Sequence, residues 1–490
     1  MGETQLPVSP HVLIFPFPAQ GHVNSMLKLA ELLCLSGFKI TYLVPKNIHQ
    51  RLLLHTNIES RFSQYQGFCL QSLPDGIYEG SVSTGDDVVK LCDSLNSVAV
   101  PFLRELLTPK SDWNNTKSPI TTIIADGIFS VVIDFAQEIG VPILYFRTIS
   151  ACAFWAYFSI HELIEAGEIP FSGNDMDLAI KKVKGMEAYL RGRDLPSFCR
   201  ATDIGNPILK ILSKETRETA RANGLIMNTF DDLEGPILSQ IQIHCPNIYT
   251  IGPLHAHLKS RLAAANSNSA PNTSSNSLWA EDRNCIQWLD QQPSKSVLYV
   301  SFGSHAVVTK EQLMEFWQGL VNSGVKFLWV IRPDSIVDQN DEEGKSKSIQ
   351  EELEAATKER GYMVGWAPQE QVLAHPAVGG FWTHSGWNST LESIMEGVPM
   401  ICWPYFADQQ TNSRFVGEVW KIGLDMKDTC DKVIVEKMIR ELMVIKKDEF
   451  LKTANEIAKL GRKSIEQDGS SYCNLDRLIQ DIRLMSNPEQ

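Results

Sequence analysis

The sequence predicts an α/β protein made of two doubly wound domains that face one another. The chain has 490 residues, which is too long for one hydrophobic core and suits two domains of roughly 200 to 250 residues each. In both halves, short apolar runs typical of buried strands alternate with amphipathic stretches typical of helices. Between the halves lies a stretch rich in Ser, Asn and Ala, residues 258–277, which indicates a flexible surface connection. Together these observations predict two Rossmann-like domains.

We place the first domain at residues 1–252, the connection at 253–282 and the second domain at 283–455, with helices in residues 456–490. Composition is ordinary for a soluble globular protein, with 43% hydrophobic and 21% charged residues. The net charge of −13 argues against binding to nucleic acid or to an anionic membrane surface.

Ten cysteines are scattered along the chain without a C-x-x-C pair, a pattern typical of reduced thiols in the cytoplasm. The first ten residues lack the basic and apolar regions of a signal peptide. No apolar run reaches the roughly 18 residues of a membrane helix. We therefore expect a cytoplasmic protein with no integral membrane segment.

The first domain opens with a strand at 11–17, a helix at 23–36 and a second strand at 38–44. Apolar residues at 26, 29, 30 and 33 give the helix one core-facing side. The turn before the helix places His22 at the helix N-terminus, where the helix dipole favours the neutral, basic form of the ring. By position alone, His22 is as readily interpreted as a capping or packed histidine.

A second residue changes that interpretation. The strand at 120–125 ends at Asp126, and the carboxyl ends of strands in an open parallel sheet face one crevice, so His22 and Asp126 are expected to meet there. An Asp beside a His fixes its tautomer and stabilises the imidazolium that forms on proton uptake. The pair predicts general-base catalysis.

The remaining elements complete both sheets. Residues 141–146 predict a strand that is followed by Thr148, residues 154–222 have a looser pattern, and further strands are expected at 224–228, 248–252, 297–302, 327–331 and 362–365, with a short helix at 285–289. Gly303 and Ser304 follow the strand at 297–302, and a small turn there can offer N–H groups and a hydroxyl to a diphosphate.

Residues 366–409 carry the most informative pattern. A strand at 378–384 ends at His384, and a helix begins at Asn388 and ends at Gly397. The free N–H groups of such a helix start, around Asn388 and Ser389, bind phosphate, and His384 can add a ring donor.

Other side chains of this stretch suit the rest of a nucleotide sugar. Glu392 lies one turn into the helix and can accept hydrogen bonds from ribose hydroxyls, while Trp366 offers a flat face to a base. Asp408 and Gln409 follow a strand at 398–403 and suit a sugar, because an acceptor and a donor-acceptor match its hydroxyls. The stretch predicts a pocket for a nucleotide diphosphate that carries a sugar.

This stretch resembles the signature box of the plant secondary-product members of the UDP-dependent glycosyltransferase family, which begins at Trp366 and closes at Gln409. Ser385 stands where the family often has Cys. The resemblance continues in the motif PFPAQGH around His22. It implies the GT-B architecture, final helices that pack back on the first domain, and an acceptor pocket shaped by residues 154–222. It also implies donor contacts from Thr148 and from further box residues, namely Ala367, Gln369 and Trp387.

We therefore expect an inverting transferase in which His22, supported by Asp126, deprotonates an acceptor hydroxyl that attacks the anomeric carbon opposite UDP, giving a β-glycoside. Gln409 and the absence of Arg from the box favour UDP-glucose as donor. No metal and no other cofactor is expected, because the only D-x-D, Asp175 to Asp177, lies in a polar loop with no strand leading into it.

The acceptor stays open at this stage. The opening and overall spacing resemble the subgroup that acts on terpenoids, iridoids and cyanohydrins, while flavonoids and other phenolics, and a carboxyl in place of a hydroxyl, remain alternatives. The partners expected are a small-molecule acceptor and a UDP-sugar, with the chain acting as a monomer. Two other classes remain: a sugar-nucleotide epimerase, and a noncatalytic UDP-sugar-binding protein.

Overall fold

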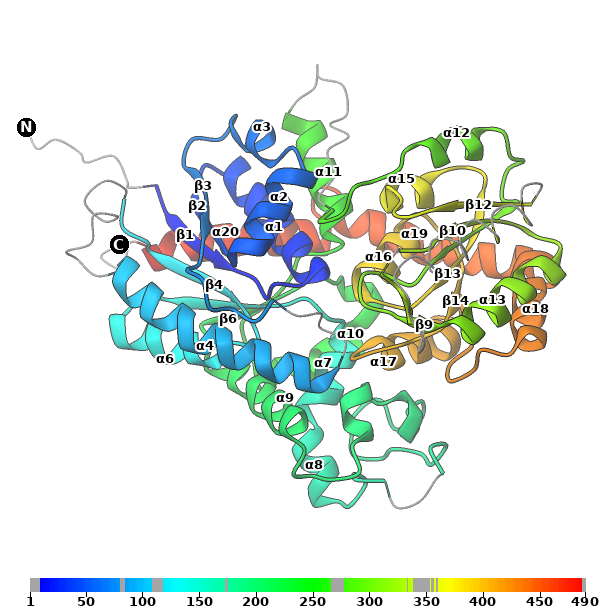
Figure 1. The fold of residues 1–490 in the computed structure, drawn as a ribbon. Helices are drawn as coiled ribbons and strands as arrows, with labels where there is room; N and C mark the ends of the chain where they lie inside the picture. The colour runs from blue at the N-terminus through cyan, green and yellow to red at the C-terminus, as the bar shows by residue number, and fades with distance from the viewer. Residues whose placement is uncertain are drawn as a thin grey trace, which may run out of the picture.

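The structure is a computed structural model that describes residues 9–79, 84–107, 118–171, 175–265, 277–332, 334–337, 353, 357 and 360–486. It contains two large parallel sheets, one in each half of the chain, and the two halves lie side by side (Figure 1). The predicted α/β class with two doubly wound units is confirmed.

The first sheet has seven strands in the order β3-β2-β1-β4-β5-β6-β7. The strands are β1 (His11–Phe15), β2 (Lys39–Val44), β3 (Phe68–Ser72), β4 (Thr122–Asp126), β5 (Ile143–Arg147), β6 (Gly224–Met227) and β7 (Ile248–Thr250). The chain runs outward from β1 to β3 and then returns to pair β4 with the other side of β1. The topological switch point, where such sheets bind ligands, therefore lies between β1 and β4.

Both faces of this sheet are buried. In β1, Leu13 and Phe15 belong to one apolar cluster, and Val12 and Ile14 belong to another on the opposite face. Helices cover each face: α1 (Gln20–Leu35), α2 (Lys46–His55), α11 (Leu254–Ala265) and α20 (Ser470–Ser486) on one side, and α4 (Gly85–Leu107), α6 (Ser130–Ile139), α7 (Ala151–Phe158) and α9 (Pro207–Glu218) on the other. Because both faces are buried, the strand sequences are continuous runs of apolar residues.

The second sheet has six strands in the order β12-β10-β8-β13-β14-β15. They are β8 (Val297–Ser301), β10 (Lys326–Val330), β12 (Gly361–Val364), β13 (Val378–Thr383), β14 (Met400–Cys402) and β15 (Gly423–Asp425), and β9 (Val308–Thr309) pairs with β11 (Ile336–Val337) in a small separate sheet. Here the switch point lies between β8 and β13. The residues after these two strands, including Ser304 and His384, therefore share one edge.

Helices surround the second sheet and connect the halves. They are α12 (Asn284–Asp290), α13 (Lys310–Ser323), α15 (Gln369–Ala374), α16 (Trp387–Met395), α17 (Gln409–Arg414), α18 (Lys432–Arg440) and α19 (Lys447–Ile465), with π-helical turns η4 (Phe415–Val419) and η5 (Glu441–Ile445). The first half also contains α3 (Ile58–Phe62), α8 (Ile160–Glu165) and α10 (Asp231–Gln242), and the 3-10 turns η1 (Gly192–Asp194), η2 (Ser197–Arg200) and η3 (Thr219–Arg221).

The last helix returns to the first half. In α20, Leu475 and Leu478 are buried in the same cluster as Val12 of β1, and Asp481 accepts a hydrogen bond from the Tyr249 hydroxyl at 2.7 Å. Figure 1 shows α20, in red, lying beside the strands of the first sheet. The chain thus crosses from the second half to the first at its end.

The prediction of a flexible connection at 258–277 is wrong for residues 258–265. These residues belong to α11, whose Leu254, His257 and Leu258 are buried. Apolar residues spaced along this helix pack on the first half, and this packing decides the structure where the Ser- and Ala-rich composition suggested a coil. Residues 266–276 lie outside the described part, and the domain boundaries at 252, 282 and 455 remain predictions.

The turn that carries His22 also differs from expectation. The first strand ends at Phe15, two residues earlier than predicted, and the helix begins at Gln20 instead of residue 23. The cause is the Ala19 carbonyl, which accepts N–H bonds from His22 at 3.0 Å and Val23 at 2.9 Å, so the turn is already helical at His22.

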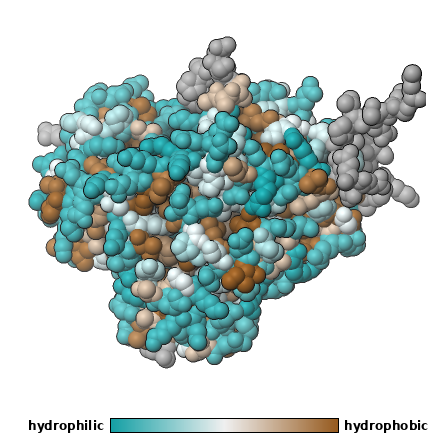
Figure 2. Space-filling model, turned by 180° about the vertical axis from the view of Figure 1, so that it is seen from behind, coloured by the Kyte–Doolittle hydropathy of each residue, from teal (hydrophilic) through white to brown (hydrophobic). Residues whose placement is uncertain are grey.

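The surface in Figure 2 is largely hydrophilic, with apolar residues scattered among polar ones. Exposed large hydrophobic residues are spread over several elements, for example Leu54, Ile243 and Val433. In the described part of the chain, no helix combines the length and the apolar character needed to cross a membrane.

Candidate active site

A cavity of about 1270 Å³ lies between the two halves and is lined by residues after both switch points. The structure brings every predicted site residue to this cavity: His22, Asp126, Thr148, Ser304, Trp366, Ala367, Gln369, His384, Trp387, Asn388, Ser389, Glu392, Asp408 and Gln409. The size suits a nucleotide sugar together with a small second substrate.

His22 and Asp126 are in direct contact. The Nδ1 atom of His22 lies 2.6 Å from Oδ2 of Asp126, whose side chain is 1% exposed, while that of His22 is 26% exposed. The N–H of Phe17 also donates to Asp126 Oδ2, at 3.3 Å. The carboxylate is thus fixed at the end of β4, and it orients an imidazole whose ring still borders the cavity.

Thr148 lies beside the histidine. Its hydroxyl oxygen is 2.9 Å from His22 Nδ1 and 3.5 Å from Nε2. The resemblance implied a contact with the sugar or the diphosphate, and the structure adds this contact with the His22 ring. The end of β5 thus supports the same imidazole as the end of β4.

The start of α16 is built to approach a ligand closely. Its N-cap residue is Gly386, which has no side chain of its own to cap the first turn. A Cβ atom would lie 2.4 Å from the His384 ring at Gly386 and 2.5 Å from it at Gly303, which has a φ of 71°. Two glycines therefore flank His384, and only glycine fits these positions.

His384 is neutral at physiological pH. Burial, followed by the charges of His305 and Arg332, lowers its pKa to about 4. Its buried Nδ1 atom has no hydrogen-bond partner in the described part of the protein. A neutral imidazole still donates one N–H, so the ring can serve a phosphate as a dipole but not as a cation.

Polar contacts join the side chains of the cavity around Gln369. The Gln369 amide nitrogen donates to Ser389 Oγ at 2.8 Å and to Glu392 Oε2 at 2.7 Å. Burial and the neighbouring Glu370 raise the pKa of Glu392 to about 7. Trp366 stacks on Trp279, with ring centroids 5.7 Å apart, and lines the cavity.

The side chains of Asp408 and Gln409, which also line the cavity, form hydrogen bonds with other groups of the protein. Asp408 Oδ2 accepts from the Asn412 amide at 2.8 Å, and burial raises the pKa of Asp408. Gln409 Oε1 accepts the N–H groups of Tyr405 and Phe406 at 2.8 and 2.9 Å. The Gln409 carbonyl oxygen is thus used by the loop backbone, and its NH₂ group carries two further hydrogens that can be donated. The contact of Gln409 with a sugar remains a prediction.

The side chain of Asn388 is also used by the protein itself. Its Nδ2 donates to the Gly21 carbonyl at 2.9 Å and its Oδ1 accepts from Ser25 at 2.8 Å. The predicted phosphate contact at Asn388 uses the backbone N–H and remains a prediction. Trp387 also reaches across, with its indole N–H donating to the Asn228 carbonyl at 2.7 Å. The start of α16 is thus joined to the His22 helix.

Sequence reasoning missed three of these partners: Ser25, Asn228 and Asn412. Two of them carried a signal. Asn228 directly follows strand β6, where polar residues face the crevice, and Asn412 lies four residues after Asp408, on the same face of α17. The role of Ser25 could not have been predicted, because a Ser hydroxyl one turn into a helix ordinarily donates to a backbone carbonyl of its own helix. The Ser25 hydroxyl also has the Gly21 carbonyl within hydrogen-bond distance.

The two aspartates of the D-x-D motif interact with other groups of the protein. Asp175 Oδ1 accepts the N–H of Asp177 at 3.0 Å, and the Asp177 carboxylate pairs with Arg191 at 3.1 Å and Arg193 at 2.7 Å. Asp177 therefore belongs to an ion cluster with Arg191 and Arg193, and Asp175 accepts a backbone N–H of the same loop.

Comparison with known proteins identifies the family. The chain is 58% identical to a 7-deoxyloganetic acid glucosyltransferase from Catharanthus roseus, over 99% of both chains, and residues 273–455 match the family described as UDP-glucoronosyl and UDP-glucosyl transferase. The chain belongs to the UDP-glycosyltransferase family.

Other relatives of this UDP-glycosyltransferase agree with that placement. It is 43% identical to a myricetin 3-O-rhamnoside 1,2-glucosyltransferase from Crocosmia x crocosmiiflora, over 98% of this chain and 97% of the relative. Its fold is similar to the crystal structure of Os79 from O. sativa in complex with UDP, with a TM-score of 0.77, 27% identity, and coverage of 96% of this chain and 100% of that chain. The UDP-glycosyltransferase therefore has the GT-B architecture, and it binds a UDP-sugar and a small-molecule acceptor.

Proposed function

We propose that this enzyme transfers glucose from UDP-glucose to a hydroxyl of an iridoid acid and inverts the anomeric configuration, giving a β-glucoside. The observation that carries the proposal is the His22–Asp126 pair at the switch point of one sheet, bordering the same cavity as the box residues at the switch point of the other. In this arrangement, acceptor activation and UDP binding come from opposite walls.

His22 acts as the general base. Asp126 engages Nδ1, so Nε2 is the nitrogen that takes the proton of the acceptor hydroxyl. The hydroxyl oxygen attacks the anomeric carbon as its bond to UDP breaks, and the imidazolium that forms is stabilised by Asp126. The negative charge that grows on the diphosphate is met by the N–H groups at the start of α16 and by His384.

The proposed acceptor class follows the relative that acts on 7-deoxyloganetic acid. A cation also lines the cavity: Arg147, a buried residue adjacent to Thr148. Its guanidinium donates to the Gly127 carbonyl and to the Thr216 hydroxyl. The charges of Asp126 and Glu215 also act on it, so Arg147 is already compensated within the protein and the preference for an acid rests on the relative.

The proposal is tested by incubating the enzyme with UDP-glucose and a matched acceptor panel: 7-deoxyloganetic acid, its methyl ester and a flavonol glycoside. We expect a hexose mass shift with the acid, at a higher kcat/KM than with the ester. The relative that acts on a myricetin rhamnoside makes the flavonol glycoside the second candidate, and preference for it would overturn the iridoid assignment. No transfer to any acceptor would overturn the proposed activity.

The donor is predicted to be UDP-glucose. The box contains no Arg to pair with a uronic carboxylate, and buried Asp408 disfavours a second negative charge beside it. Initial rates with UDP-glucuronate and UDP-galactose should therefore fall well below the rate with UDP-glucose. A rate with UDP-glucuronate or UDP-galactose that equals the rate with UDP-glucose would contradict the donor assignment.

We further propose that the enzyme acts as a monomer in the cytoplasm. Both walls of the cavity come from one chain. The ten cysteines are free thiols, nine of them buried or partly buried, which suits a reducing compartment. Light scattering of the purified protein and imaging of a fluorescent fusion test these two points.

A further inference from the structure

The loop before Gln409 contains a strained residue. Ala407 has a φ of 56°, in the left-handed region that a residue with a Cβ atom rarely adopts unless its surroundings hold it there. Its neighbours Phe406 and Asp408 both line the cavity. A change of backbone conformation at Ala407 would therefore move Asp408 relative to a bound sugar.

Ser197 of the first half holds Ala407 in this conformation. The Ala407 N–H donates to Ser197 Oγ at 2.8 Å, and the Ser197 N–H donates to the Ala407 carbonyl at 2.9 Å. The next residues extend the contact, because the rings of Phe198 and Phe406 meet edge-on with centroids 4.9 Å apart. Both backbone groups of the strained residue are thus paired with a single residue from the opposite wall.

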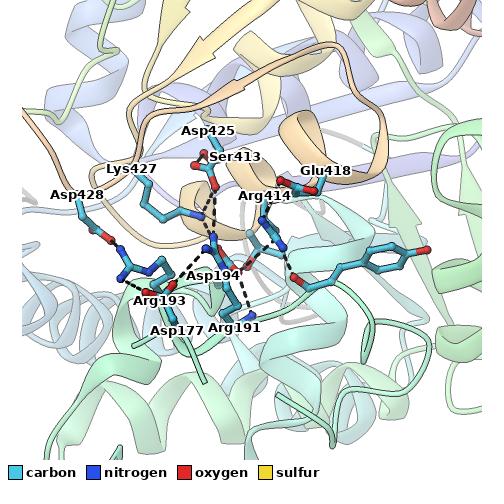
Figure 3. Close-up of polar contacts among 12 residues, drawn as sticks. Asp177, Arg191, Arg193, Asp194, Ser413, Arg414, Glu418, Asp425, Lys427 and Asp428 are labelled. Atoms are coloured by element: carbon cyan, nitrogen blue, oxygen red, sulfur yellow. Dashed lines mark hydrogen bonds and ion pairs between the residues drawn. The ribbon is translucent and has the colours of Figure 1, made fainter. Parts of the chain in front are cut away.

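The segment that carries Ser197 is itself fixed to the second half by an ion cluster centred on Asp194 (Figure 3). The buried Asp194 carboxylate accepts from Lys427 Nζ at 2.6 Å and from Arg191 Nε at 2.8 Å. The Asp194 carbonyl accepts from the hydroxyl of Thr411 at 2.8 Å, and Thr411 lies two residues after Gln409. Contacts within the protein therefore fix the segment that carries Ser197.

We propose that Ser197 is a positioning residue for the donor sugar. It keeps Ala407 left-handed, and this conformation places Asp408 and the Gln409 amide against the hexose. The inference rests on the proposed function, because it takes this loop to contact the transferred sugar. UDP has no hexose, so the affinity for UDP alone does not depend on the loop.

The test compares Ser197→Ala with wild type and with Ser239→Ala, a surface control whose hydroxyl donates only within its own helix, to Gly235. Ser197→Ala should lower kcat/KM for the UDP-sugar that wild type uses fastest by roughly 3- to 10-fold, the effect of one lost hydrogen bond. UDP affinity, measured by calorimetry, should stay within about twofold, since the contacts near α16 remain. Ser239→Ala should leave both values unchanged.

A second substitution separates positioning from general stability. Glycine adopts a positive φ without support, so adding Ala407→Gly to Ser197→Ala should restore most of the lost kcat/KM. A double variant no better than Ser197→Ala would overturn the proposal. So would an equal loss of affinity for UDP and for the UDP-sugar, or an unchanged kcat/KM in Ser197→Ala.

Failure of the proposed function gives a different result. In that case wild type transfers no sugar, and calorimetry with UDP-glucose and UDP still decides the role of Ser197. Weaker binding of UDP-glucose but not of UDP by Ser197→Ala would support the positioning role. Equal affinities of wild type and variant for UDP-glucose would overturn it.

Discussion

At the scale of single residues, the reacting centre depends on one imidazole with two supports. Asp126 and Thr148 come from the ends of neighbouring strands, and both approach Nδ1 of His22, at 2.6 and 2.9 Å. In the proposed mechanism, the protein holds Nδ1, and Nε2 takes the proton of the acceptor. His22 is exposed enough to reach a substrate, whereas Asp126 is not.

His22→Ala should remove nearly all transfer to an alcohol acceptor, by about 100- to 10,000-fold in kcat, because a positioned general base is commonly worth that factor. UDP affinity should not change, since the proposed UDP contacts lie on the other wall. A carboxyl acceptor is already ionised at neutral pH, so ester formation should survive better in the same variant. Single-turnover rates and UDP calorimetry on wild type and variant check this prediction.

Asp126→Asn is the matched variant that tests how Asp126 supports the His22 ring. It should lower kcat less than His22→Ala does, because it disturbs the orientation and charge stabilisation of the base without deleting it. Wild-type rates in His22→Ala, with UDP affinity retained, would show that His22 is only a packed histidine at the start of a helix.

Glu392 predicts a pH dependence of donor binding. Its pKa is raised to about 7 by burial and by Glu370, so its carboxylate becomes populated as pH rises. The carboxylate is the form that we propose accepts hydrogen bonds from the ribose hydroxyls. UDP-glucose affinity should therefore increase between about pH 6 and about pH 8. His384 does not contribute to this change, because its pKa of about 4 keeps it neutral throughout.

Calorimetry with UDP-glucose is the suitable measurement, since the diphosphate of this donor does not titrate in that range. Glu392→Gln should bind more weakly at high pH and lose most of the pH dependence. An affinity of wild type that is constant, or that falls as pH rises, would contradict the assigned role of Glu392.

At the scale of elements, the turn between β13 and α16 was predictable and its side-chain directions were not. The strand, the turn and the helix ending before Gly397 follow from apolar runs, small residues and glycine, which act locally. Asn388 and Gln409 are turned by partners far away in sequence or by loop backbone, such as Gly21 and Tyr405. A pattern along one segment carries no information on such partners.

The ion cluster around Asp194 could not be predicted from the sequence either. Asp194 lies in residues 154–222, where the sequence has no regular period, and its partner Lys427 is 233 residues away. Burial alone would raise the pKa of Asp194, but the hydrogen bonds from Arg191 and the charge of Lys427 outweigh it, so the pKa lies below the ordinary value of 3.8. The charged form of Asp194 is thus the form that stabilises the fold.

Asp194→Asn should reduce the free energy of unfolding by roughly 3 kcal/mol at neutral pH, because it breaks a buried ion pair and leaves Lys427 under-compensated. The depressed pKa means that this contribution is fully present above the ordinary Asp pKa and is lost as pH falls through the lower folded value. Denaturant unfolding at about pH 7 and about pH 3 should show the gap between wild type and variant shrinking in acid. A gap that stays constant or widens would contradict this account of the cluster.

At the scale of the whole molecule, the two switch points explain why the site lies where it does. One falls between β1 and β4 and the other between β8 and β13, and both edges open on the same cavity. The sequence was sufficient to predict two doubly wound units and the residues at both edges, because strand ends are local features. It was not sufficient to predict helix α11 or the contact of Ser197 with Ala407, because both depend on packing between distant segments.

The central claim is that the acceptor on His22 attacks the anomeric carbon from the side opposite UDP. The most direct test is the anomeric configuration of the product that wild type forms from UDP-glucose. It is read from the proton NMR coupling constant between the anomeric proton and the proton on the neighbouring carbon. A single displacement across the cavity turns the α-linked donor into a product with the large coupling of a β-glucoside. A product with the small coupling of an α-glucoside would contradict the facing arrangement of base and leaving group.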